Sequence, residues 1–273
     1  MLSIQIMGGL GNQLFQIFTA LAYSLKHKTK LILPKNKNDE IARPAYWDTF
    51  LKELKPILVE QNIPFRVLQE RGFEYVEIPK ITGINFKLLG YFQSYKYFEE
   101  QYDKIYEFLK IDEKKVIVQT NQNIDFQNTI SLHFRIGDYK SIQEHHPIMP
   151  VEYYIKSLQY ILTKTKKDDW NILYFYEESD GADVKKIIDK MIEIFPNVSF
   201  IAIDHKLLDY EQMLLMSVCR HNIIANSSFS WWGAYLNNNM DKIVCRPNIW
   251  FGSAEGGKNI KDLCPPCWVN IEI

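Results

Sequence analysis

The chain has 273 residues, with 32 Lys and Arg against 33 Asp and Glu, so its formal net charge at neutral pH is −1. Hydrophobic residues make up 47% and charged residues 24% of the sequence, a composition that excludes a disordered, collagen-like or coiled-coil chain. The balanced charge produces no global field toward nucleic acid, and we expect no nucleic-acid partner.

The chain begins with the elements of an α/β domain. Residues 2–7 predict a strand, and the glycine-rich turn at 8–11 leads into a helix whose apolar residues recur at helical spacing. Asn12 is the predicted N-cap of this helix. Residues 31–33, which a proline stops, predict the next strand. Strand, glycine turn, helix and strand in this order indicate a doubly wound α/β domain.

The sequence predicts neither a signal peptide nor a membrane span. The first seven residues are too short for the apolar region of a signal peptide, and glycines follow them instead of a cleavage site. No window approaches the roughly 18 apolar residues of a transmembrane helix. We therefore expect a cytoplasmic protein without a transmembrane segment, for which peripheral membrane association stays open.

A polar stretch in the middle of the chain marks the predicted domain boundary. A helix is predicted for residues 95–111, and the following residues 119–128 are mostly polar, as is typical of a connecting segment. The length of the chain suits two domains. We therefore expect two α/β domains, at residues 1–125 and at residues 126–273.

Strands and helices alternate regularly in the second half of the chain. Strands are predicted for residues 129–135, 171–176, 198–203, 222–225 and 243–245. Helices are predicted for residues 151–164, 183–195, 209–218 and 229–238. Asp209 is the predicted N-cap of the third of these helices, and Gln212 completes its capping box. The alternation predicts a mainly parallel sheet with helices on both faces. We expect two Rossmann-like α/β domains that face a cleft, with ligands at the carboxyl ends of the strands.

The glycine turn is the first candidate site. Gly9 and Gly11 allow backbone N–H groups to approach a ligand at the positive end of the following helix, with Asn12 and Gln13 beside them. The alternative is a tight turn that binds nothing. As a dinucleotide-binding motif the turn lacks both the third glycine and the acid after the second strand.

His133 and Arg135 form the second candidate site. On a strand over residues 129–135 alternate side chains share a face, so both residues point the same way. A His and an Arg are costly to bury without a partner, and the planar fork of Arg matches the oxygens of a phosphate. The alternative is an internal ion pair between Arg135 and Asp138.

Small polar residues at the start of a predicted helix form the third candidate site. Hydroxyls, N–H groups and the helix dipole together can bind an anion. The alternative is ordinary N-capping before a Trp-rich core helix. The residues of this cluster are Asn226, Ser227, Ser228 and Ser230.

Polar residues after the strand at 171–176 form the fourth candidate site. The strand is followed by Glu177, Glu178, Ser179 and Asp180. Acids at the carboxyl end of a strand can accept hydrogen bonds from ribose hydroxyls or a base edge. The alternative is a solvated turn. No Asp-x-Asp sequence occurs in the chain, so the acid pair with which many sugar transferases bind a metal is missing, and we expect no metal site.

Four cysteines are too few for a disulfide framework. Cys264 and Cys267 are spaced like a redox pair, but no second pair is present for a zinc site. The two residues are predicted to be either structural thiols or a local disulfide.

Three motifs in this order resemble the α-1,2-fucosyltransferase family: Gly8-Gly-Leu-Gly-Asn-Gln-Leu-Phe-Gln16, His133-Phe-Arg-Ile-Gly-Asp-Tyr139 and Asn226-Ser-Ser-Phe-Ser-Trp-Trp-Gly-Ala234. Residues 90–94 and 209–216 also look like segments of that family, and the resemblance spans residues 4–245. It implies a GT-B-like fold, GDP-fucose as donor, a glycan acceptor, and no metal or other cofactor. It also implies that the N-terminal domain at residues 1–125 is the acceptor side and that the C-terminal domain at residues 126–273 binds the GDP-sugar. It further implies an inverting transfer of L-fucose to the 2-hydroxyl of a terminal galactose or similar sugar.

The resemblance also implies roles for individual residues. Arg135 resembles the arginine that holds the donor β-phosphate, His133 the residue near the guanine, and Asn12 a cleft-facing residue. The family pattern His-x-Arg-Arg-x-Asp has a second arginine where this chain has Ile136. Asp138 either acts as general base or only orients Arg135. The serines that resemble the phosphate cradle are Ser227, Ser228 and Ser230.

Two other classes of protein stay open on the sequence. An NAD-linked Rossmann oxidoreductase would use the glycine turn, although that turn lacks two parts of the dinucleotide-binding motif. A non-catalytic carbohydrate-binding protein with a degraded transferase site is favoured only by Ile136.

Overall fold

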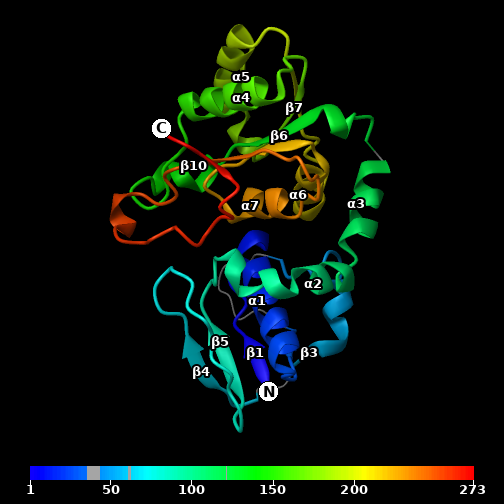
Figure 1. Ribbon diagram of the computed structural model, residues 1–273, viewed down its shortest axis with the longest axis vertical. Coiled ribbons are helices and arrows are strands. Elements are labelled where there is room, and N and C mark those ends of the chain that lie inside the picture. Colours follow the sequence, from blue (N-terminus) through cyan, green and yellow to red (C-terminus); the bar gives the residue numbers. More distant parts are fainter. Residues whose placement is uncertain (36–43, 61–62, 121) are drawn as a thin grey trace. The chain divides into compact units, whose positions relative to one another are not determined.

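The computed structural model describes residues 1–35, 44–60, 63–120 and 122–273. The chain divides into two compact units (Figure 1). Unit 1 comprises Met1–Lys114 and Lys258–Pro265, and unit 2 comprises Lys115–Gly257 and Pro266–Ile273. This division differs from the predicted one after residue 125. It falls within helix α3 (Ile111–Thr120), and a segment near the C-terminus joins unit 1 through contacts with residues far away in the sequence. Residue 121 of the predicted boundary lies outside the described residues.

Unit 1 is built on parallel strands. They are β1 (Leu2–Ile4), β2 (Leu33–Pro34), β3 (Leu58–Val59), β4 (Arg66–Gln69) and β5 (Phe86–Leu89). β5 pairs with β1 on one side and with β4 on the other, and β2 pairs with β3. A parallel bridge between Leu2 and Leu31 connects β1 to the segment before β2. Unit 1 therefore has a three-stranded sheet in the order β4-β5-β1 and a two-stranded sheet of β2 and β3. The bridge places the second sheet on the free side of β1, so the strand order reverses between β1 and β5.

The helices of unit 1 pack aromatic side chains together. They are α1 (Leu10–His27), α2 (Tyr102–Phe108) and the 3-10 turns η1 (Lys52–Ile57), η2 (Tyr95–Tyr97) and η3 (Glu99–Gln101). Phe15 and Phe18 of α1 meet the ring of Phe98, at centroid distances of 6.0 and 5.5 Å. The segment at 95–111, predicted as one helix, is instead two 3-10 turns followed by α2 and the first residue of α3.

Two predictions about the N-terminus need correction. The predicted strand at 2–7 ends at Ile4, because the amide of Gln16, and not a neighbouring strand, binds the backbone N–H of Met7 at 2.8 Å. The predicted N-cap at Asn12 is wrong, because α1 begins at Leu10 and its N-cap is Gly9, without a side-chain cap.

Unit 2 contains a six-stranded sheet in which every pairing is parallel. Its strands are β6 (Thr129–His133), β7 (Asn171–Phe175), β8 (Ser199–Ala202), β9 (His221–Ile223), β10 (Val244–Pro247) and β11 (Val269–Ile271). Their spatial order is β11-β10-β9-β6-β7-β8. This is the doubly wound order, which reverses between β6 and β9. The prediction of a parallel sheet in the second half is confirmed.

Helices cover both faces of the unit 2 sheet (Figure 1). α4 (Val151–Thr165) and α5 (Gly181–Ile194) lie on one face, and α6 (Asp209–Val218) and α7 (Ser228–Tyr235) lie on the other. The main core cluster joins apolar side chains of β6, β7, α4 and α5. Short 3-10 turns occur at η4 (Phe126–Asn128), η5 (Gly137–Ser141), η6 (Glu178–Asp180) and η7 (Ser253–Glu255).

The predicted cap of α6 is shifted by one residue. Leu208 is the N-cap, and its backbone N–H donates to the carboxylate of Glu211 at 2.8 Å. Asp209 is instead the first residue of the helix, and the side chain of Gln212 donates to the carbonyl of Leu207.

Among the described helices, none combines the length and the apolar character that a bilayer crossing requires. Cys264 is buried, Cys267 is exposed, and no disulfide joins these two described residues.

Candidate functional site

The candidate site of unit 2 lies where the strand order of its sheet reverses. In doubly wound sheets, ligands bind at the carboxyl ends of the strands at this point. Residues 134–138 follow β6, residues 224–228 follow β9, and residues 176–180 follow β7. Because β6 pairs with both β7 and β9, the three segments leave the sheet side by side. The second, third and fourth candidate sites of the sequence therefore belong to one place.

Arg135 is the cation at this place, and it is paired with two carboxylates. Its Nη1 donates to Glu177, and its Nη2 lies 2.6 Å from Oδ1 of Asp138. The side chain of Arg135 is 18% exposed, and its guanidinium lies 5.1 Å from the ring centroid of Tyr139. Burial lowers the pKa of Arg135, but the charges of Glu177 and Asp138 raise it by more, so the guanidinium stays ionised.

Glu177 belongs to the predicted fourth site, but its pairing with Arg135 was not predicted from the sequence. The register of β6 on β7 places His133 opposite Phe175. Two residues further along both strands, Arg135 therefore meets Glu177. Gly137 permits this approach, because a Cβ on it would lie 2.5 Å from a carboxylate oxygen of Glu177. Only the strand register could have identified this partner.

His133 is buried and has an unsatisfied nitrogen. It is the last residue of β6 and is 7% exposed, and its ring lies 5.6 Å from that of Phe229. Burial, together with the charge of Arg135, lowers its pKa to about 3. The imidazole is therefore neutral, and its buried Nδ1 has no hydrogen-bond partner within the described structure. Buried polar atoms are nearly always hydrogen-bonded in proteins, and a ligand can supply the missing partner.

Some polar groups at the start of α7 are hydrogen-bonded within the protein, and others are not. Ser227 is the N-cap, and its hydroxyl accepts from the N–H of Phe229 at 3.3 Å. Ser230 donates back to the carbonyl of Ser227. The Asn226 amide nitrogen donates to two loop carbonyls, at 2.9 and 3.2 Å, while its buried Oδ1 has no partner among the described residues. Ser228 is half-buried at the first position of the helix.

Asp180, which was predicted to accept hydrogen bonds from a ligand, is instead buried and bonded within the protein. Asp180 is 2% exposed, and its carboxylate accepts from the N–H of Gly137 at 2.7 Å and lies 3.4 Å from Nζ of Lys140. It therefore fixes the loop after β6 to the loop after β7. Ser179 is exposed in η6.

Ile136, which stands where the resembling family has a second arginine, is part of the core. It is 4% exposed and lies in the apolar cluster of unit 2. The described site therefore gains no second cation from this position.

The glycine turn belongs to unit 1. Gly8 has a positive φ of 74°, which glycine adopts readily, and Gly9 and Gly11 lie at the start of α1. Gln13 is fully buried, and its amide nitrogen donates to the carbonyls of Gly8 and Pro44. Asn12 is half-buried, and its Oδ1 accepts from Nε2 of Gln93 at 2.7 Å.

These features define a class of protein with two α/β units, each built on parallel strands. An arginine, a neutral histidine and a helix N-terminus lie where the strand order of unit 2 reverses, which is the switch point of its sheet. A solved structure, ADP-heptose LPS heptosyltransferase II of Escherichia coli, matches 100% of this chain and 89% of its own, with a TM-score of 0.50 and 9% identity. This similarity shows the fold, which is of the GT-B type.

The profile of glycosyl transferase family 11 matches residues 1–272, and the chain belongs to this family. An α-1,2-colitosyltransferase of Escherichia coli is 32% identical over 98% of this chain and 98% of its own length. A galactoside 2-α-L-fucosyltransferase of Caenorhabditis elegans is 23% identical over 99% of this chain and 79% of its own length. The family resemblance of the three sequence motifs is confirmed, and the NAD-linked oxidoreductase is set aside.

Proposed function

We propose that this glycosyltransferase moves L-fucose from GDP-fucose to the 2-hydroxyl of a terminal galactose of a glycan, with inversion and without a metal. The observation that carries the proposal is Arg135 at the switch point of unit 2, beside the unsatisfied His133 and the start of α7. The names of the two relatives support both the sugar class and the 1,2 linkage.

In this proposal, Arg135 and the N-terminus of α7 stabilise the negative charge of the leaving group. The acceptor hydroxyl bonds to the anomeric carbon of fucose on the face opposite GDP, while the bond from that carbon to the β-phosphate oxygen breaks. The electron pair of the broken bond goes to GDP. Preorganised donors that meet such charge typically contribute about 3–4 kcal/mol each to lowering the barrier. The guanidinium, held by Asp138 at 2.6 Å, and the N–H groups at the start of α7 are such donors.

Glu177 and His133 have distinct proposed roles at the donor. The carboxylate of Glu177 keeps the guanidinium charged and oriented before the donor arrives, and the diphosphate then replaces it on Nη1 of Arg135. The neutral imidazole of His133, with its unsatisfied Nδ1, contacts the guanine.

Asp138 has two candidate roles that one variant separates. As general base it would take the proton of the acceptor hydroxyl, and as an orienting group it would only hold Arg135 while the proton passes to water. An Asp138→Asn variant keeps a hydrogen-bond acceptor for Arg135 but cannot act as the base. A loss of about a hundredfold or more in kcat with unchanged GDP affinity would indicate a base.

Metal independence follows from the same charge arrangement, because Arg135 and α7 are assigned the task that a divalent cation performs elsewhere. We expect transfer to persist in excess EDTA. A tenfold or greater loss that Mn²⁺ or Mg²⁺ restores would contradict this part of the proposal.

Two donors are candidates, GDP-fucose and GDP-colitose, because the 32% identical relative is named a colitosyltransferase. Colitose is 3-deoxy-L-fucose, so the two donors differ by one hydroxyl. The deciding experiment measures GDP release from GDP-fucose, GDP-colitose and GDP-mannose, first without acceptor and then with disaccharides that end in galactose. Product linkage is read by NMR. GDP-fucose as the best donor and a new bond at the 2-hydroxyl support the proposal; no consumption of any donor indicates a non-catalytic carbohydrate-binding protein.

A further inference from the structure

The sheet of unit 1 has its own switch point, which the donor site does not use. Its strand order reverses between β1 and β5. The glycine turn follows β1, and the loop Gly90–Ser94 follows β5. Because β1 and β5 are parallel neighbours, both segments leave the sheet at the same edge, where ligands of α/β sheets bind. Gln93 and Asn12, one from each segment, are hydrogen-bonded at 2.7 Å.

The Gly90–Ser94 loop is held in a strained conformation. Phe92 is 3% exposed and has a φ of 52°, a left-handed conformation that is uncommon for a bulky residue. The carboxylate of Glu70 accepts from two consecutive backbone N–H groups, those of Tyr91 at 2.8 Å and Phe92 at 3.0 Å. A Cβ on residue 90 would lie 2.4 Å from the Cβ of Glu70, so glycine is required there. Strain of this kind persists where surrounding contacts impose it, and it concentrates at functional sites.

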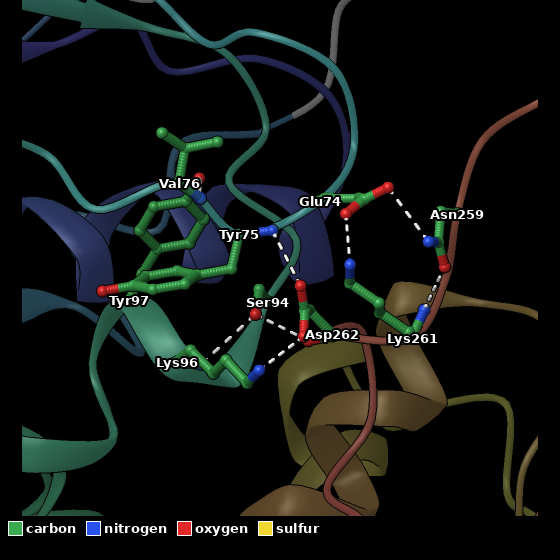
Figure 2. Close-up of polar contacts among 9 residues, drawn as sticks. All are labelled: Glu74, Tyr75, Val76, Ser94, Lys96, Tyr97, Asn259, Lys261 and Asp262. Carbon is green, nitrogen blue, oxygen red and sulfur yellow. Dashed lines mark hydrogen bonds and ion pairs between the residues drawn. The ribbon is translucent and has the colours of Figure 1, made fainter.

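A segment from near the C-terminus holds the other end of this loop, as Figure 2 shows. The hydroxyl of Ser94 donates to the carbonyl of Asp262 at 2.6 Å. The Asp262 carboxylate, on a residue 5% exposed, accepts from Nζ of Lys96 at 2.5 Å and from the N–H of Tyr75 at 3.2 Å. Nearby, Glu74 contacts Asn259 and Lys261 of the same segment. Residues 168 positions apart in the sequence thus fix the loop.

The groups that this loop presents are uncharged. Tyr91 is 43% exposed, and Gln93 and Asn12 are half-buried amides. The nearby cation, Lys96, is paired with Asp262. An aromatic ring and amides that both donate and accept suit a ligand rich in hydroxyls, whereas the arginine of the unit 2 switch point suits an anion.

We propose that the Gly90–Ser94 loop binds the acceptor sugar, with Tyr91 and Gln93 as specificity-determining residues. Glu70, Ser94 and Asp262 are the positioning residues. This inference rests on the proposed function, since it assumes that the ligand is a neutral glycan. The amide of Gln93, oriented by Asn12, hydrogen-bonds the acceptor hydroxyls, and the ring of Tyr91 packs on the sugar.

The test compares kinetic constants for donor and acceptor in full-length variants, with lactose as acceptor. We expect Gln93→Ala and Tyr91→Ala to raise the KM for lactose about tenfold. The KM for GDP-fucose and the rate of acceptor-free donor hydrolysis should stay within about twofold, because these report on unit 2 alone. Asp262→Asn and Ser94→Ala should raise the lactose KM in the same selective way by about threefold or more, as positioning residues do.

Matched controls are available in the same unit. Gln69 is an exposed glutamine on β4, and Phe108 is 49% exposed on α2. Gln69→Ala and Phe108→Ala should leave both KM values within about twofold. Lactose KM values for Gln93→Ala and Tyr91→Ala that match those of the controls would overturn the inference, as would equal losses for donor and acceptor.

A binding measurement separates this inference from the proposed function. Ligand-observed NMR of lactose, without donor, should show contacts to the wild-type protein that weaken in Gln93→Ala. Such a result would support the loop as a sugar site even if fucose transfer were not found. Signals that are absent in the wild type, or equal in both proteins, would overturn the inference whatever the donor proves to be.

Discussion

Arg135 lies between two carboxylates, and both the charge and the shape of its guanidinium matter for the proposed transfer. Arg135→Ala should lower kcat/KM by about 10²–10³, the range for one donor to a developing anion. Arg135→Lys keeps the charge but loses the planar fork, so we expect it to recover less than about a tenth of wild-type activity. Steady-state kinetics measure both effects.

The control for this prediction is stability. Removing Arg135 leaves Asp138 and Glu177 without their shared cation, so urea unfolding of each variant must show a folded protein. Near-normal turnover of the lysine variant would mean that charge alone suffices. An active alanine variant would mean that Arg135 is structural.

Glu177 competes with the diphosphate for Arg135 in the proposed mechanism. Glu177→Gln removes that negative charge, so we expect GDP to bind about threefold or more tightly, as measured by calorimetry. Glu178→Gln is the matched control, because it makes the same change in net charge at the neighbouring exposed acid. Weaker GDP binding in Glu177→Gln alone would mean that Glu177 supports the nucleotide instead of competing with it.

At the scale of elements, helix α7 offers one hydroxyl that its own structure does not use. Ser227 caps the helix and Ser230 bonds to Ser227, while no hydrogen bond of the Ser228 hydroxyl occurs among the described residues. Ser228→Ala should therefore weaken GDP binding by about tenfold to a hundredfold, the effect of a lost hydrogen bond to a charged group. The acceptor KM should change by less than about twofold.

A serine elsewhere provides the comparison for Ser228. Ser253 is exposed at the first position of η7, and Ser253→Ala should leave GDP binding unchanged. An acceptor KM that rises in Ser228→Ala while GDP affinity is unaffected would reverse the assignment of α7.

Elements were predicted best where the pattern is local. The strands and helices of unit 2 follow from alternating apolar segments, and their ends differ from the predicted ones by a few residues, as for β6, which ends at His133. Short strands such as β4, whose residues are mostly exposed, were not predicted. Their pairing with neighbours, and not an apolar pattern, makes them strands.

At the scale of the whole molecule, two buried histidines should make stability depend on pH. Burial and Arg135 lower the pKa of His133 to about 3, and burial with Arg220 lowers that of His221 to about 4. In the unfolded chain both titrate near 6.5. Below that pH the unfolded state takes up protons that the folded state does not, so stability falls with pH. Between pH 7 and pH 5 we expect a loss of about 2 kcal/mol for each histidine.

Urea unfolding at both pH values tests this prediction. The Nδ1 of His221 accepts from the N–H of Ile243 at 3.0 Å, and His221→Asn keeps an acceptor there without a titrating group. The loss in this variant should be smaller than in the wild type by about 2 kcal/mol. Equal losses in the two proteins would show that His221 is not buried in its neutral form.

The sequence alone determined the class of fold and the residues around which the candidate site of unit 2 is built. Alternating strands and helices, the glycine turn at 8–11 and the residues His133 and Arg135 are local patterns, because each depends only on spacing along the chain. The tertiary structure alone decided which distant residues meet. The register of β7 on β6 brings Glu177 to Arg135, and a segment near the C-terminus brings Asp262 to Ser94. No local pattern contains these contacts, because they depend on how strands and segments far apart in the sequence pack.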